Sequence, residues 1–314
     1  MKALQQIIQR VAGNPSRSWA LATLVQTEGS TYRKPGARLL VDSDGGTLGV
    51  LSGGCLEDQI ARSGQKVIDD ASRVLLSFDT KLLYGCDGQL KILVEPLPAA
   101  GQNGNLITEI GRLLRNREVC RVRTCFEGDT LGSELLASDV LLAEQPSVLI
   151  DTVPLPVRLL LFGTGPEIEP ITQLAGNLGW IIQHFGHPSE LAEDFRPDGQ
   201  TAAVVMNHNF GRDVLALDRI RPLQLRYIGL LGPRKRYAEL LARLSEYRPL
   251  DFDAEVKTLF APAGLDIGSE APEEIALSIV SEVAAVLSER RGGFLRERRS
   301  DIHTTIPFAG GEAA

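Results

Sequence analysis

The sequence Arg158–Glu167 reads RLLLFGTGPE, an apolar strand followed by a glycine-rich turn. A strand that ends in Gly-x-Gly before a helix is typical of α/β folds that hold phosphate groups, because glycine lets the backbone turn tightly and approach the ligand at the helix N-terminus. Gly163, Thr164 and Gly165 are therefore candidate ligand-binding residues. Ile168 occupies the third glycine position of the usual dinucleotide fingerprint, so the motif is half complete.

Beyond this stretch, short apolar strands alternate with helices. We expect the strands Trp180–Phe185, Ala202–Met206 and Tyr227–Leu231 and the helices Glu167–Leu178, Asp213–Ile220, Lys235–Glu246 and Pro272–Arg290. Strict alternation of this kind predicts a Rossmann-like, doubly wound parallel sheet. We assign residues 151–293 to this domain, and we expect the charged segment 294–314 to form a mobile tail.

The N-terminal half, residues 1–150, predicts a mixed α/β (α+β) domain. Its expected helices and strands are a helix before Gly13, the helices Cys55–Asp70 and Asn105–Asn116, and the strands Trp19–Gln26, Ala37–Asp42, Thr47–Leu51, Arg73–Phe78, Gln89–Glu95, Val119–Phe126, Ser138–Leu142 and Val148–Ile150. The segment Asp151–Arg158 (DTVPLPVR) contains two prolines and marks the expected boundary.

Composition narrows the possible partners. The 314 residues include 43% hydrophobic and 23% charged residues, which is typical of globular proteins. The net charge of −7 argues against nonspecific binding to nucleic acid or to an anionic membrane, so an anionic ligand needs local cations and backbone amides. No apolar run approaches the ~18 residues that span a bilayer, and the first helix contains glutamines, unlike a signal peptide. We therefore expect a soluble, cytoplasmic protein whose four cysteines are thiols.

Two glycine-rich loops of the N-terminal half carry cysteines. Ser52, Gly53 and Gly54 lead into Cys55 at the expected start of a helix, where exposed amides attract an anion and the helix dipole lowers the pKa of a thiol. The alternative is that Cys55 is a small buried hydrophobic residue. The second loop, just before a strand, contains Gly85, Cys86 and Gly88. The two thiols lack CxxC spacing, so a structural zinc site is not expected, but both could meet one ligand.

A cationic loop and a histidine complete the candidate residues. Arg33, Lys34 and Arg38 lie close together between two strands and could neutralise a phosphate, although a solvated charged loop is the alternative. His208 follows the third parallel strand, where strand ends open onto a ligand crevice; alternatively it is solvated between two capping asparagines. The second parallel strand ends at Gly186, where dinucleotide-binding folds place a carboxylate for the ribose, so NAD(P) is not the expected ligand.

Together these segments resemble the XdhC/CoxI family, accessory proteins for molybdenum hydroxylases such as xanthine dehydrogenase. The resemblance extends to about Gly293 and rests on the ordered motifs GSTYRKPGAR (Gly29–Arg38), SGGCLE (Ser52–Glu57), GCDG (Gly85–Gly88), LVEPL (Leu93–Leu97), FGTGPEIEP (Phe162–Pro170), VVMNHNFGRD (Val204–Asp213), YIGLLGPRKR (Tyr227–Arg236) and GLDIGSEAPEEIALSI (Gly264–Ile279). Asp87 stands where many members have glycine, which leaves the role of Cys86 open.

The resemblance implies a carrier rather than an enzyme in its own right. Such a protein binds the molybdenum cofactor, inserts it into an apo-molybdenum hydroxylase and, in some members, works with a cysteine desulfurase that supplies the terminal sulfur. The resemblance also adds Glu57 to the candidate site. It places Cys55 or Cys86 near molybdenum, since thiolates suit soft metals and sulfur donors. We expect a homodimer, because symmetric dimers are the commonest oligomers. The alternatives are an NAD(P)-dependent oxidoreductase that uses the Rossmann crevice and a protein–protein adaptor without cofactor.

Overall fold

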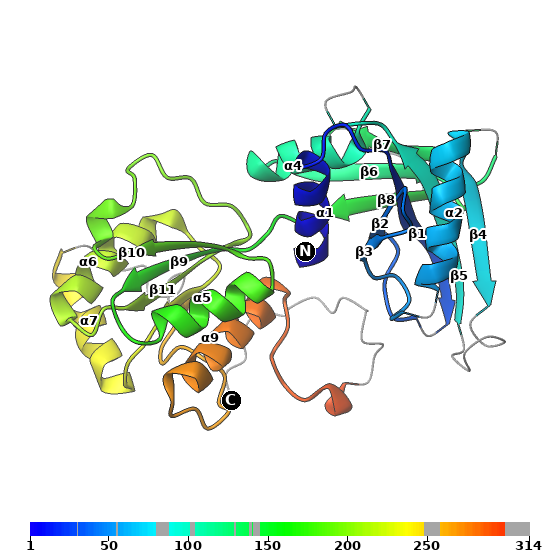
Figure 1. The fold of residues 1–314 in the computed structure, drawn as a ribbon. Coiled ribbons are helices and arrows are strands. Elements are labelled where there is room, and N and C mark those ends of the chain that lie inside the picture. Colours follow the sequence, from blue (N-terminus) through cyan, green and yellow to red (C-terminus); the bar gives the residue numbers. More distant parts are fainter. Residues whose placement is uncertain are drawn as a thin grey trace. The chain divides into compact units, whose positions relative to one another are not determined.

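The chain forms two compact units, Met1–Leu155 and Pro156–Ala314 (Figure 1). The computed structural model describes residues 1–29, 31–54, 56–79, 88–100, 104–128, 130–137, 140, 145–247 and 258–298. None of the helices in these ranges is both long enough and apolar enough to cross a membrane.

The described residues of the first unit form two antiparallel sheets and three helices. The larger sheet has the strand order β3-β2-β1-β5-β4 and the smaller one the order β7-β6-β8. The elements are α1 (Lys2–Ala12), β1 (Trp19–Gly29), β2 (Arg38–Asp42), β3 (Thr47–Gly49), α2 (Glu57–Asp70), β4 (Val74–Asp79), β5 (Gly88–Leu97), α4 (Leu106–Arg115), β6 (Cys120–Cys125), β7 (Gly132–Leu136) and β8 (Val148–Val153).

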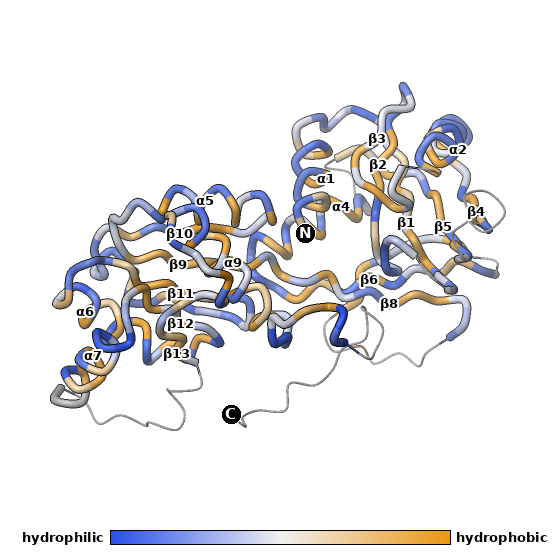
Figure 2. The backbone as a smooth tube through the Cα atoms, turned by 90° about the horizontal axis from the view of Figure 1, so that it is seen from below, coloured by the Kyte–Doolittle hydropathy of each residue, from blue (hydrophilic) through white to orange (hydrophobic). Residues whose placement is uncertain are grey.

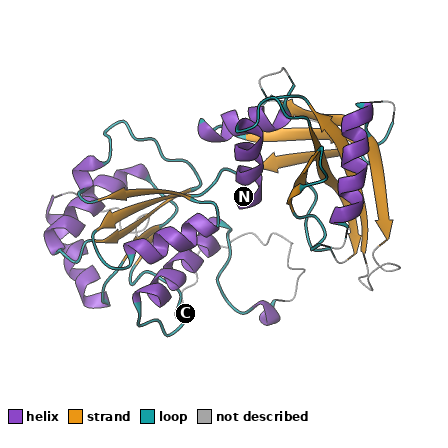
Figure 3. Ribbon diagram, in the orientation of Figure 1, coloured by secondary structure: helices purple, strands orange, loops and turns teal. Residues whose placement is uncertain are grey.

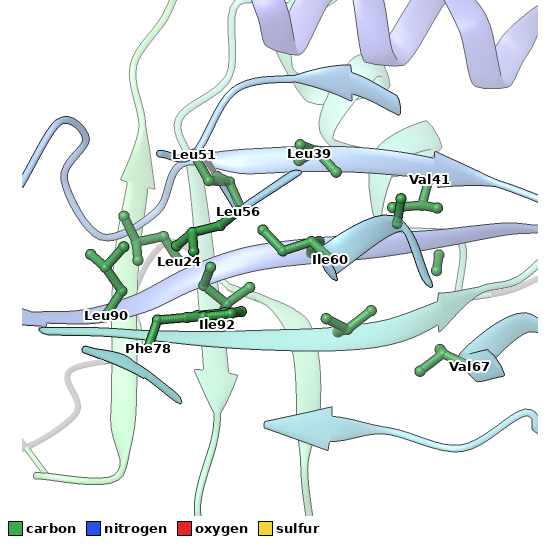
Figure 4. Close-up of a cluster of buried hydrophobic side chains, with 14 residues drawn as sticks. Leu24, Leu39, Val41, Leu51, Leu56, Ile60, Val67, Phe78, Leu90 and Ile92 are labelled. Atoms are coloured by element: carbon green, nitrogen blue, oxygen red, sulfur yellow. The ribbon is translucent and has the colours of Figure 1, made fainter. Parts of the chain in front are cut away.

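Strand β1 is covered on both faces because its alternating side chains enter two different cores. Ala20, Ala22 and Leu24 pack with α2, and this cluster is drawn in Figure 4. Trp19 and Leu21 point to the opposite face and pack with α1 and α4. A strand buried on both sides reads as an uninterrupted apolar run, and WALATLV has this character.

In the second unit, the described residues form one parallel sheet with helices on both faces (Figure 3). In Figure 2 its strands are coloured mainly as hydrophobic. The elements are β9 (Arg158–Gly163), α5 (Ile168–Asn177), β10 (Ile181–Phe185), η1 (Pro188–Glu190), β11 (Thr201–Met206), α6 (Phe210–Ile220), η2 (Arg221–Leu223), β12 (Ile228–Leu230), α7 (Arg234–Tyr247), β13 (Leu259–Phe260), α9 (Pro272–Leu287) and η3 (Leu295–Glu297). Leu159 and Leu161 of β9 face α5 and α9, whereas Leu160 and Phe162 face α6 and α7.

The parallel sheet has the strand order β10-β9-β11-β12-β13, which in chain order within this unit is 2-1-3-4-5. This is the flavodoxin-like order of doubly wound folds, in which ligands bind beyond the carboxyl ends of the strands, at the point where the chain reverses direction across the sheet. That switch point lies between β9 and β11, which pair in register from Thr201 with Arg158 to Met206 with Gly163. The fold class predicted from sequence is confirmed for both halves.

Three details differ from the sequence prediction. Helix α2 begins at Glu57 rather than Cys55. Strand β7 (Gly132–Leu136) was not predicted, and the expected strand Ser138–Leu142 lies mostly outside the described residues. The two-residue β13 was not predicted, because so short a segment has no readable periodicity. Most of the expected tail, from residue 299 onward, lies outside the described residues.

We expect Gly163→Ala to lower the free energy of unfolding by about 2–3 kcal/mol, because only glycine adopts such a backbone conformation without strain. Gly163 has φ 149°, and a β-carbon there would lie 2.3 Å from the carbonyl oxygen of Met206. Urea unfolding measures the change. Gly176→Ala in α5 is the matched control, because its β-carbon would meet no atom within 4 Å; it should be neutral or slightly stabilising. Equal losses in the two variants would contradict the prediction.

Candidate functional site

A cleft of about 840 Å³ lies at the carboxyl edge of the parallel sheet, within the second unit. Ligand sites of globular proteins commonly have volumes of ~300–1,000 Å³, and this edge is where doubly wound folds bind ligands. Glu167 and His208 form one part of the wall, and the segments after β12 and β13 form most of the rest. The remaining lining comes from α9 through Ile275 and Ser278.

His208 is held at the cleft by its two asparagine neighbours. The Asn207 amide and side chain both donate to Oδ1 of Asp213, at 3.1 Å each, and Asn209 caps α6 by accepting from the amide of Arg212. Between them His208 has φ 50°, in the left-handed region that costs non-glycine residues free energy and is found often at functional sites. The sequence offered two alternatives for this segment, a capping role for the asparagines and a position of His208 at the ligand crevice. In the structure Asn209 caps α6 and His208 also lines the cleft.

Glu167 and His208 approach each other across the switch point. Nε2 of His208 lies 3.4 Å from Oε2 of Glu167, whose side chain is only 8% exposed, whereas that of His208 is 55% exposed. Gly165 makes the approach possible, because a β-carbon there would lie 2.4 Å from Glu167 Oε2 and 2.6 Å from His208 Nε2. The second glycine of the Gly-x-Gly turn thus admits a carboxylate–imidazole pair. The described lining of the cleft does not include Gly163, Thr164 or Gly165 themselves.

A buried ion pair connects the neighbouring strand ends. Asp213 is 1% exposed and accepts two hydrogen bonds from Arg236, from Nε at 3.1 Å and from Nη2 at 2.5 Å. Because Asp213 fixes the orientation of the Asn207 amide, Oδ1 of Asn207 is buried without a partner among the described residues. Arg236 and the exposed Arg234 both line the cleft, so it offers guanidinium groups as well as the acceptors Glu167 and Asp266.

The sequence analysis missed several of these residues. Glu167 was considered only as the start of a helix, and the cations of GPRKR only as a family motif. The rule that identified His208, namely its position after a parallel strand, applies equally to Arg234 and Arg236. Glu190 was also missed: its Oε2 accepts the Gly186 amide at 3.1 Å, so a carboxylate does lie at the end of β10. A carboxylate five residues beyond the end of the strand gives no local sequence signal.

The Ser52–Gly54 segment of the first unit is anchored from both ends. Leu51 and Leu56 are each 1% exposed and belong to the core cluster beneath α2 (Figure 4). Glu57 then closes the segment from inside: its carboxylate accepts the amides of Leu51, Ser52 and Leu56 at 3.0–3.1 Å and the Ser52 hydroxyl at 2.6 Å. Glu57 therefore occupies the Ser52 amide, one of those that the sequence predicted for a bound anion.

Gly53 and Gly54 remain exposed, with φ 79° and 110°. Cys55, Gly85 and Cys86 lie outside the described residues, so their predicted roles stay predictions. Gly88 is the buried first residue of β5 and pairs with Gly29 of β1.

The cationic loop divides into an exposed part and an internal part. Arg33 and Lys34 are exposed, and the neighbouring Tyr32 ring lies 3.9 Å from the position that a β-carbon of Gly53 would occupy. The loop therefore lies beside the Ser52–Gly54 segment. Arg38, in contrast, is 7% exposed, and its Nη1 lies 2.9 Å from Oδ2 of Asp151 on β8. This internal ion pair connects the two sheets, and we no longer assign Arg38 to a ligand.

Cysteine and metal chemistry in the described residues is limited. Cys120 is buried on β6, and burial raises the pKa of its thiol to about 11, so it packs as an inert side chain. Among the described residues there is no group of three or more His, Cys, Asp or Glu side chains that could hold a metal ion.

The fold and cleft define a two-unit α/β protein with a flavodoxin-like ligand edge, and comparisons with known proteins identify its family. Residues 14–79 match the model of the XdhC and CoxI family, and residues 159–283 match that of the XdhC Rossmann domain. The chain belongs to the XdhC and CoxI family.

Two curated relatives cover most of the chain. A Bacillus subtilis (strain 168) protein described as a probable subunit of xanthine dehydrogenase is 27% identical over 312 residues, covering 84% of this chain and 91% of that protein. The molybdenum cofactor insertion chaperone PaoD of Escherichia coli (strain K12) is 25% identical over 287 residues, covering 85% and 82%. A crystal structure from Bacillus halodurans, described as a xanthine dehydrogenase, shares the fold with a TM-score of 0.76 at 24% identity, covering 93% of this chain and 97% of that one.

We expect Glu57→Gln to destabilise the protein by about 1–2 kcal/mol at pH 7, since hydrogen bonds to a charged group are replaced by weaker ones. Burial alone would raise the pKa of Glu57, but the hydrogen bonds from Ser52 and Leu51 outweigh it and hold the pKa below its ordinary value. A lowered folded-state pKa means that this stabilisation is present above the unfolded-state value of ~4.3 and is lost as the pH falls through the folded-state pKa.

The free-energy difference between wild type and Glu57→Gln should therefore shrink when urea unfolding is repeated at progressively lower pH below about 4.3. Asp58→Asn, at the exposed next position of the same helical turn, is the control and should change little at either pH. A difference between wild type and Glu57→Gln that does not vary with pH would contradict this account.

Proposed function

We propose that this protein binds the molybdenum cofactor as cargo and inserts it into an apo-molybdenum hydroxylase. The observation that carries the proposal is the cleft at the carboxyl edge of the parallel sheet, in a chain whose relative PaoD is named a molybdenum cofactor insertion chaperone. Its volume of about 840 Å³ suits a pterin-sized group. Arg234 and Arg236 supply cations for a phosphate, and Glu167 and Asp266 supply acceptors for hydroxyl or amino groups.

The buried groups of the cleft favour a ligand with mixed polarity. The carboxylate of Glu167 is nearly buried, and its described hydrogen-bond partner is His208, at the long distance of 3.4 Å. A buried acceptor without a donor costs about 1–3 kcal/mol, so a ligand that donates hydrogen bonds gains affinity at such positions. Pterin and phosphate together provide donors, acceptors and negative charge in one molecule.

The thiols of the first unit complete the proposal. We assign Cys55, and with it Cys86, to the handling of molybdenum or of the sulfur that a cysteine desulfurase would deliver, because thiolates are ligands and sulfur carriers of the required softness. Exposed Gly53 and Gly54 lead into Cys55, and the cations Arg33 and Lys34 lie on the adjacent exposed loop. A nearby cation lowers the pKa of a thiol and favours the reactive thiolate.

Co-expression in a host that makes the cofactor tests the proposal. The purified wild-type protein should carry molybdenum by elemental analysis and pterin by fluorescence, in comparable amounts, and should activate a purified apo-hydroxylase. The double variant His208→Ala, Arg234→Ala tests the residues of the cleft. It should retain less molybdenum and less pterin than the wild-type protein. A wild-type protein that retains neither molybdenum nor pterin would refute the carrier function.

We expect Cys55→Ala to abolish activation of the apo-hydroxylase while changing the free energy of unfolding by no more than about 1 kcal/mol, an ordinary value for a point substitution. Hydroxylase activity after incubation with the cofactor-loaded variant measures the loss. Cys125→Ala, at a partly buried position of β6, is the matched thiol control and should activate as wild type does. Full activation by Cys55→Ala would exclude a sulfur or metal role for this thiol.

The oxidoreductase alternative is tested by nucleotide binding. We expect neither NADH nor NADPH to bind with low-micromolar affinity, because the described lining of the cleft leaves out the Gly163–Gly165 turn, which is the segment that approaches the pyrophosphate in dinucleotide-binding folds. Isothermal titration calorimetry decides, and low-micromolar binding of either nucleotide would favour an enzyme.

A further inference from the structure

A second cavity, of about 710 Å³, lies entirely within the first unit. Its walls come from the segment before β1, the end of β5 and the chain that follows it, and the start of β7. Apolar side chains in the lining include Leu21, Ile68 and Leu106. Polar groups come from Arg73, Glu95 and a few serines. The described residues that line this cavity include none of those that we propose for the molybdenum cofactor in the second unit.

Glu95 is a buried carboxylate that uses only one of its two oxygens. It is 6% exposed; Oε2 accepts the amide of Ser133 at 3.0 Å and lies 3.9 Å from Nε of Arg73. Oε1 is buried and has no partner among the described residues. Gly132 keeps this arrangement open, because a β-carbon there would lie 3.1 Å from Nε of Arg73 and 3.5 Å from Oε2 of Glu95.

Trp19 presents the complementary group on the same face of the sheet. It is 2% exposed, and its indole Nε1 is a buried donor without a partner among the described residues. The register of β1 and β5 pairs Trp19 with Leu97 and Leu21 with Glu95. Trp19 and Glu95 are therefore diagonal neighbours, a relation in which Cβ atoms are about 7–8 Å apart and long side chains can reach a common partner.

An unpaired donor and an unpaired acceptor at one cavity indicate a ligand that supplies both partners. Each unmet hydrogen bond of a buried group disfavours the free state, and most such groups in proteins are paired. A simple cation such as an alkylammonium would satisfy Glu95 but would offer no acceptor to the indole N–H of Trp19. A planar heterocycle with a carbonyl beside ring N–H and amino donors satisfies both at once.

We propose that this cavity binds the 2-amino-4-oxopyrimidine edge of a pterin or guanine ring. The carboxylate of Glu95 accepts from the ring N–H and the 2-amino group, and Trp19 donates to the 4-oxo group. The choice of pterin over guanine rests on the proposed molybdenum cofactor function, and the cavity is then a second pterin-binding site, separate from the cleft of the second unit. The apolar side chains Leu21, Ile68 and Leu106 provide the surface against which a flat ring packs.

Tryptophan fluorescence of the full-length protein reports on this site directly. The chain has two tryptophans, Trp19 and Trp180, so a Trp180→Phe background leaves Trp19 as the single emitter. Titration with 6-hydroxymethylpterin, guanosine and adenosine should show quenching by the first, and Glu95→Gln should weaken it about ten- to a hundredfold, the value of hydrogen bonds to a charged group. Glutamine keeps an acceptor for the Ser133 amide, so the fold is preserved.

A control variant and a second test variant separate an effect on binding from an effect on folding. Glu134→Gln removes an exposed carboxylate on β7, close in sequence to Ser133, and should leave pterin affinity unchanged. Trp19→Phe removes the indole donor and should weaken binding when it is followed by the anisotropy of the pterin itself. The thermal midpoint of each variant shows whether it folds.

The outcomes separate this proposal from the proposed function. If guanosine binds as tightly as pterin, the result supports recognition of the 2-amino-4-oxopyrimidine edge and assigns the cavity to guanine nucleotides. Adenosine binding equally well, or Glu95→Gln binding pterin as wild type does, overturns the cavity assignment. If co-expressed wild-type protein retains molybdenum while free pterin neither binds nor quenches Trp19, the cavity proposal fails and the carrier function stands. If free pterin binds through Glu95 but no molybdenum is retained, the carrier function fails instead.

Discussion

The carboxylate of Asp213 is the interaction on which the ligand edge of the second unit depends. It is almost fully buried, and it holds Arg236 from the start of α7 and Asn207 from the end of β11 at the same time. Removing one member of such a buried pair leaves an uncompensated charge, which costs about 3–5 kcal/mol. The backbone of His208 is strained between Asn207 and α6, so this network also fixes where the imidazole meets Glu167.

In the first unit, the carboxylate of Glu57 likewise fixes the conformation of a loop. The Ser52–Gly54 segment has backbone amides that turn away from any sheet, and three of the surrounding amides are satisfied by one carboxylate from the next helix. The buried Leu51 and Leu56 hold both ends of the segment in the core. Between these anchors the exposed Gly53 and Gly54 have positive φ angles, which glycine adopts without strain.

Apolar periodicity was sufficient to predict the architecture, because buried strands and amphipathic helices leave strong patterns such as RLLLF and WALATLV. The candidate site was harder. Strand-end logic placed His208, but the partners Glu167, Arg236 and Glu190 depend on how loops fold back, and such contacts leave no period in the sequence. Arg38 shows the opposite error: a cation in a charged loop was read as exposed, whereas Asp151, more than a hundred residues later, draws it inside.

Hydrogen-bond satisfaction separates the structural polar groups from the binding ones. Glu57 and Asp213 look like ligand-binding acids in the sequence, yet their acceptor oxygens are occupied by the protein itself. Glu95 has a buried oxygen with no described partner, although its motif, LVEPL, looks like an ordinary strand end. Folding cannot favour an unpaired buried acceptor for stability alone, because an apolar residue of similar shape would serve better there. The unpaired groups of Trp19 and Glu95, rather than the most charged residues, are therefore the basis of the proposed pterin site.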